Sequence, residues 1–171
     1  MGQLAEFILE NRVNSTLYCI DPYIKYDNYD DALNNITDDY LFTIVYNKLK
    51  NKFGDRVIFV RKFSSDAVES IPDKIDFLYI DGNHQYKYVK EDLMNYYSKV
   101  KLDGYIIGDD AVDIDDTNRN VNGDVFIEWC PGCYGNYGVV KAFREFFSDK
   151  PDDNLIIGNQ YFVKKIKVLE K

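Results

Sequence analysis

The segment from Ile75 to Asp110 constrains the fold more than any other part of this chain, because it has the pattern of a strand, a helix and a second strand. Ile75–Ile80 and Tyr105–Ile107 are short apolar runs, and apolar residues recur at helical spacing from Gln85 to Lys99. A strand–helix–strand crossover makes its two strands parallel, so that their carboxyl ends open at the same edge of the sheet.

Residues able to carry chemistry follow both of these strands. Asp81 follows the first strand, His84 comes three residues later, and Asp109 and Asp110 follow the second strand. Open α/β sheets bind ligands outside the carboxyl ends of their strands, so we expect these four side chains to form an active site. His84 is the only histidine, and its ordinary pKa of about 6.5 suits a general base near neutral pH.

The clustered carboxylates of Asp81, Asp109 and Asp110 predict a site for Mg²⁺ or a similar cation, because they are hard oxygen ligands. Without a cation they would repel one another unless one of them stayed protonated. Two plainer interpretations stay open. Asp81 could cap the next helix, with His84 on its solvated first turn, and the acidic pair could begin a solvated loop that continues through residues 113–116.

The rest of the chain alternates strands and helices. Helices are expected from Leu4, from Asp38 and from Gly138, and strands at Ser15–Ile20 and Arg56–Val60. Leu155–Ile157 and Tyr161–Ile166 flank Gly158-Asn159 as a hairpin, whereas Ala111–Tyr137 reads as an irregular insert or lid. This order predicts an α/β fold over a single domain, residues 1–171, with a doubly wound, mostly parallel sheet and a C-terminal antiparallel hairpin.

Composition excludes some classes of partner. The formal net charge of −8 argues against nucleic acid and against an anionic membrane surface. No apolar run is long enough to span a bilayer, and three cysteines do not describe a disulfide framework, so a cytoplasmic location is expected. Cys130 and Cys133 resemble a thiol redox motif, but the loop-like sequence after them disfavours that role. The sequence does not decide whether the chain forms a homo-oligomer.

Candidate ligand-binding residues also follow the other two strands. Asp21 ends the first of them, 19 residues after Gly2, a spacing that suits a carboxylate binding ribose hydroxyls after a glycine turn. An acidic residue before Pro22 is otherwise an ordinary strand end. Ser64 and Ser65 could line an adenine pocket or cap the next helix.

The order of these segments resembles class I S-adenosylmethionine-dependent methyltransferases, which have a Rossmann-like sheet, and the nearest branch is the methyltransferase-24 type. The resemblance rests on LYCIDPY, RVIFVRKFSSDA, DFLYIDGNHQYKYVKEDL, KLDGYIIGDD and GVVKAFREFF. The spacing of DGNH and GDD is similar to that in the metal-dependent sugar O-methyltransferases of macrolide biosynthesis. The resemblance implies that Asp81, Asp109 and Asp110 hold Mg²⁺ and that His84 is the base. It further implies that S-adenosylmethionine is held by Gly2, Asp21, Ser64, Ser65 and Asp81.

One feature departs from the family pattern. A strand that ends in a glycine-rich turn should precede the first helix, and Gly2 resembles the last glycine of that turn. Either the natural chain is longer, or its sheet closes another way and binds the cofactor weakly. The expected function is Mg²⁺-assisted methylation of a hydroxyl on a sugar or glycan precursor, with lids at Tyr23–Tyr29 and Cys130–Tyr137. The alternatives are a truncated, catalytically inactive module and a metal-dependent glycosyltransferase that uses Asp113 and Asp115.

Overall fold

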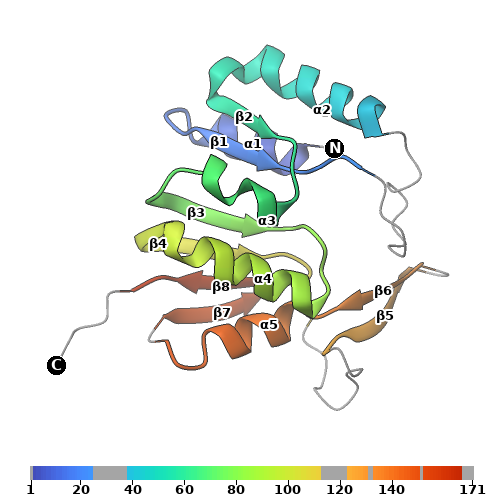
Figure 1. The fold of residues 1–171 in the computed structure, drawn as a ribbon, viewed down its shortest axis with the longest axis vertical. Coiled ribbons are helices and arrows are strands. Elements are labelled where there is room, and N and C mark those ends of the chain that lie inside the picture. The colour runs from blue at the N-terminus through green and yellow to red at the C-terminus, as the bar shows by residue number, and fades with distance from the viewer. Residues whose placement is uncertain (1, 25–37, 113–122, 131–132, 151, 167–171) are drawn as a thin grey trace. The chain divides into compact units, whose positions relative to one another are not determined.

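A computed structural model describes residues 2–24, 38–112, 123–130, 133–150 and 152–166 (Figure 1). The chain forms two compact units, Met1–Ile71 and Pro72–Lys171, and each is described by itself.

No helix within these described ranges has both the length and the apolar character that crossing a membrane requires.

The first unit is a two-stranded parallel sheet with helices. Its elements are α1 (Gln3–Asn11), β1 (Leu17–Ile20), α2 (Asp38–Phe53), the 3₁₀ turn η2 (Gly54–Arg56), β2 (Val57–Val60), α3 (Ser64–Ala67) and the 3₁₀ turn η3 (Val68–Ser70). β1 pairs with β2 in parallel from Leu17 opposite Val57 to Ile20 opposite Val60. A small core of Leu9, Val45, Leu49 and Val57 joins α1 and α2 to this sheet.

Arg56 ties the end of α1 to the start of β2. Its guanidinium donates hydrogen bonds to the carbonyl oxygens of Leu9 (2.7 Å), Arg12 (2.6 Å) and Ser15 (3.1 Å). The last carbonyl groups of a helix have no partner within the helix, and a planar guanidinium offers several donors in a fixed arrangement. Arg56 therefore satisfies the end of α1 where the chain turns into β1.

The second unit holds a mixed four-stranded sheet in the order β3-β4-β8-β7. β3 (Ile75–Ile80) runs parallel to β4 (Val100–Gly108), and β8 (Gln160–Lys164) runs antiparallel to both β4 and β7 (Asp153–Ile157). The helices are α4 (Tyr86–Tyr96), followed by the 3₁₀ turn η4 (Tyr97–Lys99), and α5 (Val139–Phe146). The predicted crossover and the predicted C-terminal hairpin are both confirmed.

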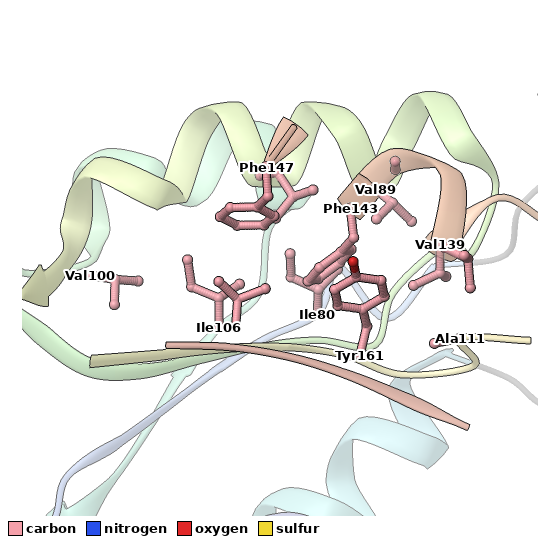
Figure 2. Close-up of a cluster of buried hydrophobic side chains, with 13 residues drawn as sticks. Ile80, Val89, Val100, Ile106, Ala111, Val139, Phe143, Phe147 and Tyr161 are labelled. Carbon is pink, nitrogen blue, oxygen red and sulfur yellow. The ribbon is translucent and has the colours of Figure 1, made fainter. Parts of the chain in front are cut away.

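Helices α4 and α5 cover one face of this sheet and enclose its core. Figure 2 shows Val89 of α4 and Phe143 of α5 over Ile80, Ile106 and Tyr161 of the strands. The ring of Phe143 lies so close to β4 that a Cβ atom on Gly108 would come within 2.6 Å of it. Glycine at position 108 therefore lets the helix pack directly on the strand that leads into Asp109.

Two sequence-based expectations are wrong. Within the segment 111–137, read as irregular, β5 (Val125–Cys130) and β6 (Cys133–Tyr137) form an antiparallel hairpin. Glycine and asparagine suggested a loop there, but pairing with a strand rich in β-forming residues overrides that local preference. The capping interpretation of Ser64 and Ser65 also fails, because α3 begins at Ser64 with Phe63 in the capping position.

We expect Arg56→Met to lower the free energy of unfolding by about 1–3 kcal/mol, because partly buried carbonyl groups lose charged donors. Urea unfolding followed by circular dichroism measures this change. Arg12→Met is the matched control, since the Arg12 side chain is exposed and its carbonyl oxygen is kept. Equal stability of the two variants would contradict the assigned role of Arg56.

Candidate active site

The carboxyl ends of β3 and β4 meet at one edge of the second unit's sheet. Ile80 lies opposite Gly108, and the backbone N–H of Asp109 donates to the carbonyl oxygen of Ile80 at 2.9 Å. Asp81 and Asp109 therefore leave neighbouring parallel strands at the same level, as the crossover pattern predicts.

His84 lies between two carboxylates. Its Nδ1 atom is 3.1 Å from Oδ2 of Asp110, and its Nε2 atom is 3.5 Å from Oδ1 of Asp81. The side chain is only 16% exposed, and Nε2 is buried with no hydrogen-bond partner among the described residues. Its approach to Asp81 is therefore electrostatic. The imidazole also stacks on the ring of Tyr137, with 5.6 Å between ring centroids.

These contacts shift two pKa values. Burial lowers the pKa of His84, but the carboxylates of Asp81, Asp110 and Asp109 together outweigh burial, and the net pKa is raised. Burial is also the main cause that raises the pKa of Asp110, with repulsion from Asp109 adding to it and His84 opposing it. The site thus holds more negative charge than its single imidazole balances.

The helix-cap interpretation of Asp81 and His84 is wrong. Helix α4 begins at Tyr86 with Gln85 in the capping position, and the His84 side chain is mostly buried before the helix starts. Asp110, which follows β4, contacts the His84 ring, and burial raises the pKa of its carboxyl group. Asp110 therefore does not stand in a freely solvated loop.

The turn that carries His84 is held by residues on both sides of the β5–β6 hairpin, Asp124 before β5 and Gly138 after β6. The backbone N–H of Gly138 donates to the carbonyl oxygen of His84 at 2.7 Å, and the N–H of Tyr86 donates to the buried carboxylate of Asp124 at 2.5 Å. A Cβ atom on Gly138 would lie 2.3 Å from the backbone nitrogen of Tyr86. Only glycine lets these two segments approach so closely.

Two amide side chains from the β7–β8 hairpin complete the site. Nδ2 of Asn159 donates to Oδ1 of Asp110 at 3.3 Å. Nε2 of Gln160 donates to the hydroxyl of Tyr79 at 2.6 Å and lies 3.4 Å from Oδ1 of Asp109. Sequence reasoning used Gly158-Asn159 only as a turn signal and missed both contacts. The feature that could have revealed these contacts is the terminal hairpin itself. Its strand β8 returns antiparallel along β4 and brings the hairpin turn to the end of β4.

Three of the candidate cofactor residues of the first unit, Asp21, Ser64 and Ser65, follow its strands. The N–H of Asp21 donates to the carbonyl oxygen of Val60 at 3.2 Å, and Oδ1 of the exposed Asp21 accepts a 2.6 Å bond from the N–H of Tyr23. Ser64 and Ser65 begin α3 after β2. Gly2 stands at the start of α1 with a φ of 64°, which favours glycine.

The predicted metal ligands have suitable chemistry but face other groups in this structure. Within the described ranges, no three His, Cys, Asp or Glu side chains are arranged to hold a metal ion. Asp81 and Asp110 face His84, and Asp109 faces Tyr79 and Gln160. Three carboxylates that share one imidazole nevertheless suit a hard divalent cation, which would balance their charge.

Some predicted residues lie outside the described ranges. These are Asp113 and Asp115, most of the Tyr23–Tyr29 loop, and the side chains of Cys130 and Cys133.

The fold and the strand-end site define the class of protein: the second unit has the crossover and terminal hairpin of a class I methyltransferase. A family model described as "Methyltransferase domain", of the methyltransferase-24 type, matches residues 3–111. This match covers well over half of the chain, and the protein belongs to that family.

Solved structures share the fold. A Corynebacterium glutamicum protein matches with a TM-score of 0.60 and 17% identity, over 97% of this chain and 68% of that chain. The O-methyltransferase NovP matches with a TM-score of 0.59 and 20% identity, over 96% of this chain and 66% of NovP. A methyltransferase from Geobacter sulfurreducens matches with a TM-score of 0.57 and 15% identity, over 95% of this chain and 65% of that chain. The chain therefore spans about two thirds of the length of these proteins.

One curated relative is an uncharacterized protein of Acanthamoeba polyphaga mimivirus. It is 38% identical over 68 residues, which are 37% of this chain and 31% of that protein.

We expect Gly138→Ala to lower the free energy of unfolding by about 1–3 kcal/mol, because the added methyl group would overlap the backbone at Tyr86. Gly82→Ala is the matched control in the same site, since a Cβ atom there meets nothing within 4 Å. Chemical denaturation of both variants measures the difference. If Gly138→Ala were as stable as Gly82→Ala, the close approach of the two segments would be refuted.

Proposed function

We propose that this protein transfers a methyl group from S-adenosylmethionine to a hydroxyl group of a sugar or glycan precursor, with the help of a divalent cation. Membership of the methyltransferase family supports the transfer. The observation that carries the choice of a hydroxyl acceptor is the buried, unpartnered Nε2 atom of His84, held between the carboxylates of Asp81 and Asp110.

Asp110 gives His84 the orientation of a general base. With the Nδ1 proton directed to Oδ2 of Asp110, Nε2 keeps its lone pair free to accept a proton. A hydroxyl placed between Nε2 and Asp81 would pass its proton to Nε2 as its oxygen attacks the methyl carbon. S-adenosylmethionine, when bound, would supply the methyl group, and its sulfonium sulfur would keep the electron pair of the carbon–sulfur bond that breaks. Positioning of the two reactants supplies much of the acceleration.

Asp81, Asp109 and Asp110 would hold Mg²⁺ or a similar cation. When bound, such a cation supplies a Lewis acid that binds acceptor oxygens and lowers the pKa of the reacting hydroxyl. The chain contributes the hard oxygen ligands and keeps His84 beside them.

Asp21 would bind the ribose of the cofactor. The N–H of Tyr23 binds Oδ1 of Asp21 and so orients the carboxylate, whose second oxygen can accept a bond from a ribose hydroxyl. Gly2 would admit the cofactor close to the start of α1, and Ser64 and Ser65 would lie near the adenine. Asp81 is also among the proposed cofactor-binding residues.

A small hydroxylated acceptor fits the remaining observations. The ring of Tyr137 is stacked nearly parallel to the His84 ring. It places an aromatic side chain beside the base, and sugar rings pack well on aromatic side chains. The net charge of −8 disfavours nucleic acid and anionic membranes as partners. We further propose that the protein is cytoplasmic and that it forms a homo-oligomer.

The first test is cofactor binding. Calorimetry should show that the unchanged chain binds S-adenosylmethionine. The Asp21→Ala variant should bind the cofactor about 10–100-fold more weakly, because it loses a charged hydrogen bond to the ribose. Asp55→Ala is the control, since Asp55 is fully exposed in the same unit. Absence of heat at millimolar cofactor would favour the catalytically inactive module.

The second test is turnover, measured as S-adenosylhomocysteine formed with Mg²⁺ and a panel of sugars. His84→Ala should lower kcat about 10²–10⁴-fold, and Asp109→Asn should abolish turnover, as should a chelator. Activity of the unchanged chain should fall as the pH drops through the pKa of His84, since only neutral imidazole accepts a proton.

Asp76→Asn is the control for these variants, because Asp76 is an exposed carboxylate on β3 that pairs with Lys101. Turnover that survives both the chelator and Asp109→Asn would contradict the cation's role. Cleavage of a sugar nucleotide without S-adenosylmethionine would instead favour the glycosyltransferase.

A further inference from the structure

We propose that Arg61 is a positioning residue that orients the carboxylate of Asp21 for binding the ribose of S-adenosylmethionine. This inference rests on the cofactor site of the proposed function. It gives a role to the first residue after β2, which sequence reasoning did not single out.

Arg61 and Asp21 follow the two paired strands of the first unit. β1 and β2 are parallel, with Ile20 opposite Val60, so the two residues leave the sheet side by side. The backbone N–H of Asp21 donates to the carbonyl oxygen of Val60 at 3.2 Å, which fixes the start of the loop after β1 against β2. The cation and the carboxylate therefore begin at the same level of one sheet edge.

The guanidinium of Arg61 joins the loop after β1 to the first turn of α2. Its Nε atom donates to the carbonyl oxygen of Pro22 at 3.4 Å, and its Nη2 atom lies 2.7 Å from Oδ1 of Asp39. Its Cζ atom lies 4.9 Å from the centroid of the Phe42 ring, so the cation also packs over an aromatic ring. A planar guanidinium can make all three contacts at once. Arg61 therefore fixes where the segment 21–23 lies relative to α2.

The ring of Phe42 carries the same constraint to Tyr23. Phe42 packs edge-on against Tyr23, with 5.1 Å between ring centroids, and against Phe59 of β2, with 5.8 Å. Tyr23 is the residue whose N–H donates to Oδ1 of Asp21 at 2.6 Å. A ring held between the sheet and the loop thus keeps this donor in place. The protein orients one oxygen of Asp21, and the other can accept a bond from a ribose hydroxyl.

The charge of Arg61 also favours the ionised form of Asp21. Partial desolvation raises the pKa of the Asp21 carboxyl group even though the residue is exposed, and the Arg61 cation acts against that rise. Among the described residues, Arg61 forms its ion pair with Asp39 and none with Asp21. It therefore favours the charge of Asp21 without occupying the oxygen that the ribose needs.

The test is calorimetric titration of the full chain with S-adenosylmethionine. Arg61→Met keeps much of the side-chain length without its charge or donors, and it should weaken affinity about 3–30-fold because Asp21 loses its orientation. Lys62→Met is the matched control, since it removes the same charge from the next residue, whose ammonium group binds the hydroxyl of Ser70 instead. This control should bind the cofactor as the unchanged chain does.

A double variant separates positioning from a purely structural role. If Arg61 acts through Asp21, adding Arg61→Met to Asp21→Ala should change affinity by less than about twofold, because the group that Arg61 orients is already gone. Urea unfolding of the same samples shows whether each variant is folded at the temperature of the titration.

The outcomes are distinguishable. Weaker binding by folded Arg61→Met, with no further loss in the double variant, supports the inference. If Arg61→Met binds as tightly as the unchanged chain while Asp21→Ala binds weakly, the inference is overturned and the proposed role of Asp21 stands. If the loss persists in full in the double variant, Arg61 does not act through Asp21 and the inference is again overturned. If Asp21→Ala binds as the unchanged chain does, or the unchanged chain gives no heat, the proposed cofactor site fails and the inference fails with it.

Discussion

The parallel pairing of β3 with β4 is the interaction on which the site depends. Ile80 lies opposite Gly108, and the hydrogen bond from Asp109 to Ile80 places the ends of both strands at one level. Phe143 packs directly on Gly108, so the core beneath the sheet holds the strand that leads into the acidic pair. A shift of one residue would turn every side chain of the strand to the other face and disperse the site.

Electrostatic imbalance gives this site its chemical character. A mostly buried imidazole lies between the carboxylates of Asp81 and Asp110, and burial with a neighbouring charge raises the pKa of Asp110. Burying several charges with too few partners is costly, and such arrangements concentrate at functional sites. The neutral amides of Asn159 and Gln160 contact the carboxylates of Asp110 and Asp109.

Much of the fold followed from local patterns. The apolar runs at Ile75–Ile80 and Tyr105–Ile107, joined by a helix, predicted the crossover, and Gly158-Asn159 predicted the terminal hairpin. The β5–β6 hairpin was missed, because β6 contains a glycine and an asparagine that suggest a loop, and pairing with β5 makes the segment a strand. Local propensity cannot include a partner that lies elsewhere in the chain.

The sequence by itself determined which groups stand at the strand ends: three carboxylates and one histidine, because parallel strands in a crossover open at the same edge. Only the tertiary structure decided how they pair: Asp110 with Nδ1 of His84, Asp81 near Nε2, and Asp109 toward Tyr79 and Gln160. The physical reason is that these contacts depend on side-chain directions, on the left-handed backbone of Asp110 and on a hairpin some 50 residues away, none of which is encoded in local spacing.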